Sequence, residues 1–269
     1  MVVQHNLTAM NSNRQLGITT KQQSKSTEKL SSGYKINRAA DDAAGLAISE
    51  KMRRQIRGLT QASANAQDGI SCVQTAEGAL GEVHDMLQRM NELAVKAKNG
   101  TNTSVDRVYI DQEVQNLISE INRVQSTTTF NEKNLLDGSF DEALQVGAEA
   151  GQVITLSISN MDASTLGVGS IDVKTTSAAG SAIDSIKDAL AKVSEQRAQL
   201  GAIQNRLEHT IKNLDNVVEN TTSAESQIRD TDMASEMVKF SNNNILAQAG
   251  QSMLAQANQT NQGVLSILG

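Results

Sequence analysis

Several residue types are scarce or missing from this chain of 269 residues, and each absence excludes something. The chain has no proline, a residue that breaks helix interiors, so long helices can run without interruption. It has no tryptophan, and aromatic residues make up only 2% of it, which is few for the core of a compact globular domain. These absences favour an elongated helical protein.

Other absences limit the class of protein. The single cysteine, Cys72, cannot form a disulfide within the chain. No run approaches about 18 consecutive apolar residues, so we expect no membrane span. The net charge of −6 argues against a nucleic-acid-binding surface. The N-terminus lacks the pattern of a cleaved secretory signal, so composition alone indicates a cytosolic protein.

A seven-residue repeat of apolar and small residues predicts long helices. Between residues 64 and 98 it forms two seam lines: Ala66, Val73, Leu80, Leu87, Ala94, and Gly69, Ala76, Val83, Met90, Ala97. This spacing is typical of a helix packed lengthwise against others, and Asn99-Gly100 is expected to end it. A second helix is predicted over 104–125. A third, of about 40 residues, repeats apolar residues at Ile186, Val193, Leu200, Leu207 and Leu214.

The region 130–175 has a different pattern. QVITLSISN, residues 152–160, alternates apolar and polar side chains, which is the period of a half-buried strand. LQVGAEAG, residues 144–151, supplies a partner strand and a glycine-containing turn. The sequence therefore predicts a small β element here.

Both ends of the chain are polar, with widely spaced apolar residues. Alone, the segment 1–38 could form only a weak helix, because it cannot offset its ordering entropy. The last segment is similar, and Asp230 or Thr231 is predicted to cap its helix. We expect the two ends to order together, on assembly.

Two long stretches resemble the signatures of bacterial flagellins. SSGYKINRAADDAAGLAISEKMRRQIRGL, residues 31–59, resembles the N-terminal signature, and residues 200–269, from LGAIQNRLEHTIKNLDNVVENTTSAESQIRD onward, resemble the C-terminal one. Only a short stretch near 160–180 joins the two regions. The resemblance therefore implies a minimal core flagellin without the variable outer domains.

The resemblance implies a fold that is mainly α. We expect an elongated rod of long packed helices with a small β-hairpin element and paired N- and C-terminal helices. The implied inner-core helices are an N-terminal one at 1–42, which is disordered in the monomer, and a C-terminal one at 230–269. Between them we expect rod helices at 43–130, a β-hairpin and connecting region at 131–177, and a C-terminal rod helix at 178–229.

The function implied by the resemblance is structural and not enzymatic. A flagellin polymerises into the flagellar filament for motility, through head-to-tail packing that does not close. It leaves the cell by the flagellar type III route without a cleaved signal peptide, and becomes part of an extracellular filament. The implied partners are other copies of the chain, the export apparatus, an export chaperone at the C-terminal segment, and hook–filament junction and cap proteins. No nucleic acid, membrane or cofactor is implied.

The resemblance also implies recognition by host Toll-like receptor 5. The family's RxxEL arrangement maps onto QRMNELAV, with a further glutamate on the next helix, giving these receptor-binding residues: Gln88, Arg89, Glu92, Leu93 and Glu113. Leu93 lies off both seam lines and four residues from Arg89. The pattern alone favours the alternative that Leu93 packs on the 104–125 helix. The resemblance favours an exposed anchor at an interface, and we therefore expect Leu93 to be exposed.

No catalytic or metal site is predicted. Asp41 and Asp42 are adjacent and would diverge by about 100° on a helix, so a helix-start or structural role is expected. Cys72 lies beside a seam line and is predicted to pack as a small hydrophobe. The three histidines lie in separate segments without metal-ligand spacing: His5, His84 and His209.

Other functions fit the sequence less well than that of a flagellin. A filament-associated or secretion-system rod protein, or a signalling coiled coil, would match less well at both ends and lack the β element. Enzymatic flagellins carry an inserted outer domain, for which the short middle region leaves no room. A junction protein would lack QRMNELAV.

Overall fold

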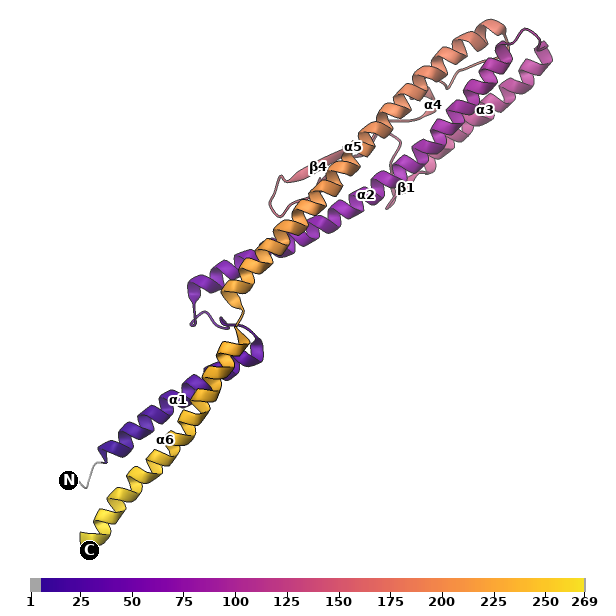
Figure 1. Cartoon of the computed structure of the whole chain (residues 1–269). Helices are drawn as coiled ribbons and strands as arrows, with labels where there is room; N and C mark the ends of the chain where they lie inside the picture. The colour runs from indigo at the N-terminus through magenta and orange to yellow at the C-terminus, as the bar shows by residue number, and fades with distance from the viewer. Residues whose placement is uncertain (1–5, 269) are drawn as a thin grey trace. The chain divides into compact units, whose positions relative to one another are not determined.

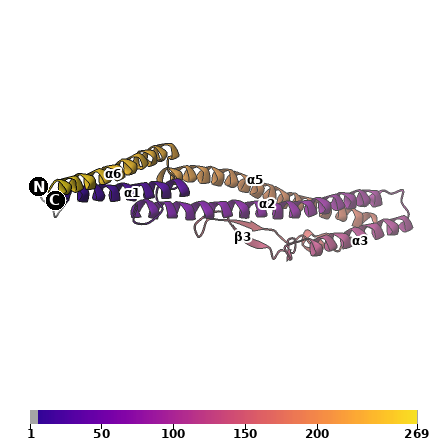
Figure 2. The ribbon, with the colours of Figure 1, turned by 90° about the horizontal axis from the view of Figure 1, so that it is seen from below.

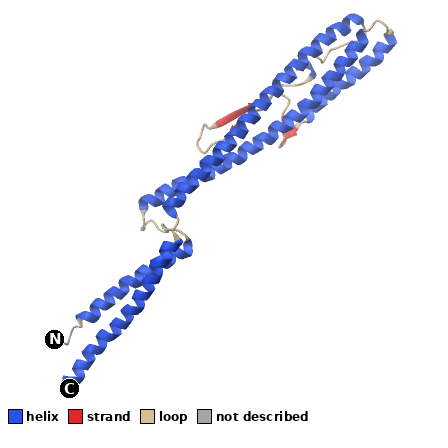
Figure 3. Cartoon of the chain, viewed as in Figure 1, coloured by secondary structure: helices blue, strands red, loops and turns tan. Residues whose placement is uncertain are grey.

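The computed structural model describes residues 6–268, with side chains as far as Thr260. The described part of the chain does not include residues 1–5, Gly269 or the side chains beyond Thr260. His5 and the two ends of the predicted terminal segments therefore lie outside it. The chain is mainly α, as predicted (Figures 1 and 3). It separates into two compact units, Met1–Arg54 with Asn220–Gly269, and Gln55–Glu219.

In the unit Gln55–Glu219, three long helices pack side by side: α2 (Ala43–Lys98), α3 (Ser104–Thr127) and α5 (Thr176–Arg229) (Figures 1 and 2). Every predicted seam residue of α2 is buried, and so is each α5 residue of the seven-residue repeat. The same core takes in Ile110, Val114 and Ile121 of α3. The predicted lengthwise packing is therefore confirmed.

Local sequence explains where these helices begin and end. α2 ends at Lys98, directly before Asn99-Gly100, as predicted. α3 begins with a capping box in which Thr103 Oγ1 accepts from the Asp106 amide (3.3 Å) and the Asp106 carboxylate accepts from the Thr103 amide (2.9 Å). α5 begins at Thr176, before its apolar repeat starts.

The predicted β element is the antiparallel hairpin of β3 (Asp141–Gln145) and β4 (Val153–Ser157). Along β4, buried and exposed residues alternate, which matches the strand period. A shorter hairpin, β1 (Thr129–Phe130) with β2 (Lys133–Asn134), was not predicted. Its turn places Asn131 and Glu132 at positive φ, as tight hairpin turns require.

The connecting segment 158–175, which includes the short helix α4 (Ala163–Leu166), is a packed part of the same unit. Its buried apolar residues include Ile158, Met161, Leu166, Val168, Ile171 and Val173. Polar side chains on one face of α3 bind the backbone of this segment. Asn122 Oδ1 accepts from Ala163 N (3.0 Å) and Asp111 Oδ1 accepts from Val173 N (3.2 Å). Gln115 Nε2 donates to Ile171 O (2.8 Å).

In the other unit, α1 (Leu7–Ser32) and α6 (Met233–Leu268) run antiparallel along each other (Figures 1 and 2). The predicted pairing of the terminal helices is confirmed. Asn6 caps α1 through its side chain, which accepts from Ala9 N at 3.0 Å.

The predicted cap of α6 is wrong by one or two residues. The Asp232 carboxylate caps this helix by accepting from the amides of Ala234 and Ser235, at 3.0 and 3.2 Å. Asp230 and Thr231 instead pair with residues that follow α1. Asp230 forms an antiparallel bridge with Tyr34, and Thr231 N donates to Gly33 O at 2.9 Å.

Candidate functional site

The pair of helices α1 and α6 leaves many of its large apolar side chains exposed. We call the following residues the terminal apolar surface: Leu7, Met10, Ile18, Met233, Met237, Val238, Ile245, Leu246 and Met253. Each is between 46% and 68% exposed. Exposed apolar side chains on this scale are typical of surfaces that other molecules cover.

Two polar side chains are buried between the same helices. Ser26 is 5% exposed and Glu236 is 6% exposed. Ser26 Oγ donates to Glu236 Oε1 at 2.7 Å, and Lys239 Nζ donates to Glu236 Oε2 at 3.3 Å. The hydrogen bond from Ser26 is the main cause that lowers the pKa of Glu236. Sequence analysis missed this pair because its members are 210 residues apart, although Glu236 is the single acidic residue in the sequence of α6.

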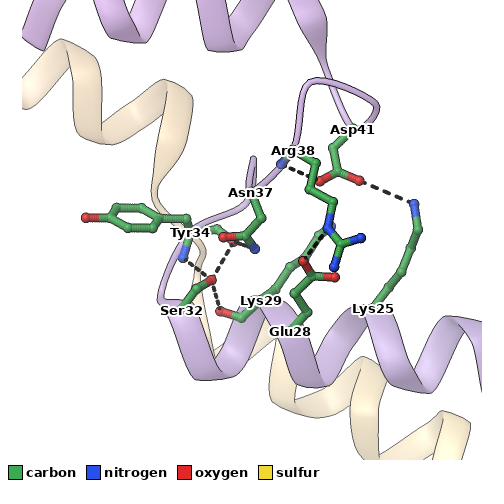
Figure 4. Close-up of polar contacts among 8 residues, drawn as sticks. All are labelled: Lys25, Glu28, Lys29, Ser32, Tyr34, Asn37, Arg38 and Asp41. Atoms are coloured by element: carbon green, nitrogen blue, oxygen red, sulfur yellow. Dashed lines mark hydrogen bonds and ion pairs between the residues drawn. The ribbon is translucent and has the colours of Figure 1, made fainter.

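The segment after α1 folds back on that helix through polar contacts (Figure 4). Gly33, at φ 76°, ends α1 in the left-handed conformation. Arg38 Nε donates to Glu28 Oε1 at 2.9 Å, and Lys25 Nζ lies 3.4 Å from Asp41 Oδ1. These contacts fix the path of the chain between α1 and α2.

Asp41 and Asp42 have structural roles, as predicted. Asp42 Oδ1 accepts from Gly45 N at 2.9 Å and so satisfies an amide in the first turn of α2. Asp41 Oδ2 accepts from Arg38 N at 3.1 Å, and this bond lowers the pKa of Asp41. Both carboxylates therefore satisfy backbone amides, Asp42 in the first turn of α2 and Asp41 in the segment that precedes it.

The segment that follows α1 is joined to the segment that precedes α6. Lys35 N donates to Arg229 O at 2.7 Å, beside the Tyr34–Asp230 bridge. Arg229 also stacks over the Tyr34 ring and donates from Nη1 to Glu50 Oε1 at 2.7 Å. Arg229 thus links the end of α5, the residue after α1's cap and the start of α2.

The structure brings together the polar residues predicted to bind a receptor. The Nε and Nη2 atoms of Arg89, on α2, donate to Glu113 Oε1 of α3 at 3.1 and 2.9 Å. Arg89 Nη1 donates to Glu92 Oε2 at 3.0 Å. All three side chains are about half exposed or more, and Gln88 is also exposed, beside His84 at 2.9 Å. The hydrogen bonds to Glu113 and Glu92 raise the pKa of Arg89.

The prediction that Leu93 is exposed is wrong. Leu93 is 3% exposed and belongs to the same buried cluster as Ile110 and Val114 of α3. The prediction from the seven-residue repeat assumed that α2 buries only the one face that carries both seam lines. Because α2 contributes to a core shared with both α3 and α5, a further line of its residues is buried, which agrees with the alternative considered for Leu93.

The remaining candidate residues have structural surroundings. Cys72 is 4% exposed, which confirms its predicted packing, and burial raises the pKa of its thiol to about 11. Within residues 6–268, no three His, Cys, Asp or Glu side chains gather as metal ligands would. In that same range, no helix combines the length and apolar character needed to cross a bilayer.

Comparison with known proteins agrees with the resemblance at both ends. The model of the bacterial flagellin N-terminal helical region matches residues 3–141, and that of the C-terminal helical region matches residues 183–268. A flagellin of Halalkalibacterium halodurans is 57% identical, and the flagellin of Bacillus subtilis is 49% identical. A flagellar filament 31.3 kDa core protein of Treponema maltophilum is 51% identical. Each of these matches covers 100% of both chains.

A solved structure is also similar. The crystal structure of a Bacillus cereus flagellin matches with a TM-score of 0.51 and 30% identity. The match covers 56% of this chain and 88% of that chain.

Proposed function

The chain belongs to the bacterial flagellin family, and on this premise we propose that the terminal apolar surface of α1 and α6 drives its assembly. As a flagellin it is a structural subunit of the flagellar filament, polymerises with copies of itself, and is not an enzyme. The proposal concerns which part of the subunit supplies the driving force.

The exposure of the terminal apolar surface carries this proposal. Full burial of one large apolar side chain contributes roughly 1.5–3 kcal/mol, so a surface of several such residues can supply substantial association energy. Packing that joins different faces of successive copies continues without closing and produces a filament. On this view segments 1–42 and 230–269 are inner-core helices that become ordered on assembly. Segments 43–130, 131–177 and 178–229 form the rest of the subunit.

The same surface supports the proposed export partners. Before assembly, exposed apolar side chains such as Ile245 and Leu246 need protection from aggregation. We assign this role to an export chaperone that binds the C-terminal segment 230–269, followed by passage through the flagellar type III apparatus to an extracellular filament. Junction and cap proteins then contact the filament ends.

Recognition by Toll-like receptor 5 is proposed for the polar surface on α2 and α3. Arg89, Glu92 and Glu113 are exposed and already hydrogen-bonded to one another, so the guanidinium is preorganised for contact. Gln88 lies next to Arg89 on the same exposed stretch. Buried Leu93 contributes by holding α2 and α3 together beneath this surface.

Seeded polymerisation tests the assembly role. Purified full chain is mixed with short filament seeds and observed by negative-stain electron microscopy. We expect filaments from the unsubstituted chain, none from a chain lacking residues 230–269, and at least tenfold slower growth from the double variant Ile245→Ser, Leu246→Ser. The conservative variant Ile245→Val, Leu246→Ile should grow normally. Growth of the serine variant at the normal rate would contradict the proposal.

A reporter-cell assay tests the receptor role. Monomeric Arg89→Ala and Glu113→Ala should each need at least tenfold more protein for half-maximal activation of Toll-like receptor 5. Arg123→Ala is the control, because Arg123 makes a similar exposed ion pair with Glu120 on α3. Full potency of Arg89→Ala would exclude this surface as the receptor site.

A further inference from the structure

We propose that the hydrogen bond between Ser26 and Glu236 sets the register in which α1 pairs with α6. The inference rests on the proposed role of these two helices in assembly. Neither the fold nor the family match assigns this role to the two residues.

Much of the contact face gives little preference for one register. Between Asn6 and Ser26, the half-buried residues of α1 are mostly small or polar: Ala9, Ser12, Leu16, Thr19 and Gln23. Leu30 of α1 and Phe240 of α6 are half-buried apolar residues, but those of α6 after Phe240 are again mostly small or polar: Asn243, Asn244, Ala247, Gly250, Leu254 and Ala257. The terminal apolar surface points away from this face and does not distinguish registers within one chain. Small residues repeated along two helices pack almost as well after a shift of one turn.

Two other contacts mark the observed register without enforcing it. A side chain at Gly250 would lie in ordinary contact with Leu16. Asn6 Nδ2 donates to Ala257 O at 2.8 Å, but every turn of α6 presents another backbone carbonyl. A shift by one turn that puts Ala247 in the place of Gly250 replaces the first contact, because a Cβ there lies in ordinary contact with Leu16.

The Ser26–Glu236 bond cannot be replaced in this way. A shift by one turn moves the Ser26 hydroxyl away from Glu236 and brings Lys29 and Leu30, or Gln22 and Gln23, towards the carboxylate, so the 2.7 Å bond to serine is lost. No other acidic residue occurs in the sequence of α6. A buried carboxylate that loses one of its hydrogen bonds is disfavoured, and a buried polar residue between helices is a known means of fixing register.

The charges around the pair keep Glu236 ionised. It lies in a groove of about 450 Å³ between α1 and α6, which is also lined by Lys25, Lys29 and Lys239. Lys25 is paired with Asp41, whereas Lys239 contacts Glu236 directly. The acceptor that fixes the register is therefore a charged one, and hydrogen bonds to charged acceptors are the stronger class.

Disulfide trapping within one chain tests the inference. In a Cys72→Ala background, Leu16→Cys with Gly250→Cys reports the observed register, because the two Cβ positions are 3.9 Å apart, within the range of a disulfide. Leu16→Cys with Ala247→Cys or with Leu254→Cys reports a shift by one turn in either direction. The fraction of internally linked chain is read on non-reducing gels, in monomer and filament fractions separately.

The expected result is a preference of at least tenfold for the observed register in the otherwise unsubstituted chain. Ser26→Ala and Glu236→Ala should each reduce this preference at least fivefold, and Ser24→Ala, at an exposed position, should not. The reversed pair, Ser26→Glu with Glu236→Ser, should restore it, because Lys29 follows position 26 by three residues just as Lys239 follows position 236.

An unchanged preference in both alanine variants would overturn the inference. So would failure of the reversed pair to restore a preference that the alanine variants had lost, because the loss would then come from general destabilisation. Absence of filaments from the unsubstituted chain would instead overturn the proposed assembly role. Filaments that form normally, with an unchanged preference in both alanine variants, would overturn the inference alone, so the two failures are distinguishable.

Discussion

The guanidinium carbon of Arg229 lies 4.8 Å from the centroid of the Tyr34 ring. This contact holds the end of α5 against the residue that follows the cap of α1, beside the Tyr34–Asp230 bridge. A cation over an aromatic ring at a partly exposed site contributes about 0.5–1 kcal/mol. The segment that follows α1 and the end of α5, which precedes α6, therefore stabilise each other through this pair.

Removal of the Tyr34 ring should loosen both segments. We expect Tyr34→Leu to speed amide hydrogen exchange at Lys35 and Thr231 by about two- to fivefold, the factor that follows from about 0.5–1 kcal/mol of lost contact energy. Tyr34→Phe keeps the ring and should leave exchange unchanged. Equal effects of the two substitutions would mean that the hydroxyl, and not the ring, is responsible.

Leu93→Ala should destabilise the folded chain by about 2–5 kcal/mol, because it removes a buried side chain from a packed core. Val95→Ala, two residues away at a position that is 54% exposed, should change stability by less than about 0.5 kcal/mol. Urea unfolding followed by circular dichroism measures both. A Leu93 variant as stable as the Val95 variant would contradict the buried position of Leu93.

Cys72 should react very slowly with thiol reagents while the chain is folded. Its thiol is buried, and its pKa of about 11 leaves little thiolate at pH 8. We expect modification by a chromogenic disulfide reagent to be at least about 100-fold slower than in guanidinium chloride. Comparable rates in the two solvents would show that the site opens readily.

Acid should weaken the pairing of α1 and α6 through Glu236. The folded state lowers the pKa of this carboxyl below its ordinary value of 4.5, so it binds fewer protons than the unfolded state in acid. Its stabilising contribution is complete above about pH 4.5 and is lost as the pH falls through the folded pKa. The charged groups that face Glu236 are Lys25, Lys29 and Lys239.

Helix content followed by circular dichroism between pH 5 and pH 3 measures this effect. The helical signal should fall more steeply in the chain that keeps Glu236 than in Glu236→Gln. Asp41 and Asp232 also have lowered pKa values, so both chains should lose some stability in acid. Parallel curves for the two chains would contradict a role for Glu236.

Much of the helical framework could be predicted from the sequence, because helix packing leaves a local record. The seven-residue repeat gave the buried line of α5, and Asn99-Gly100 gave the end of α2 to within a residue. The alternation in residues 152–160 gave β4. These features depend on neighbours along the chain, which a sequence displays directly.

The errors arise where distant segments compete for the same residues. Leu93 is buried because a third helix covers a face that a two-seam repeat leaves open. Asp230 and Thr231 do not cap α6 because their backbones pair with residues 33 and 34. The Ser26–Glu236 bond joins residues 210 positions apart and has no local signature. Of the predicted receptor residues, the meeting of Arg89 with Glu113 came from the family resemblance and not from the repeat.

The anchoring of the segment 158–175 on α3 makes this protein a candidate carrier for foreign peptides. Gly169 and Ser170 are exposed, while Val168 and Ile171 on either side are buried, and Ile171 O is held by Gln115. A peptide inserted between Gly169 and Ser170 would project from the packed helices, with a buried residue close to each of its ends. Display of an antigen or an enzyme there, one copy for every subunit, would turn the polymer into a dense ordered array.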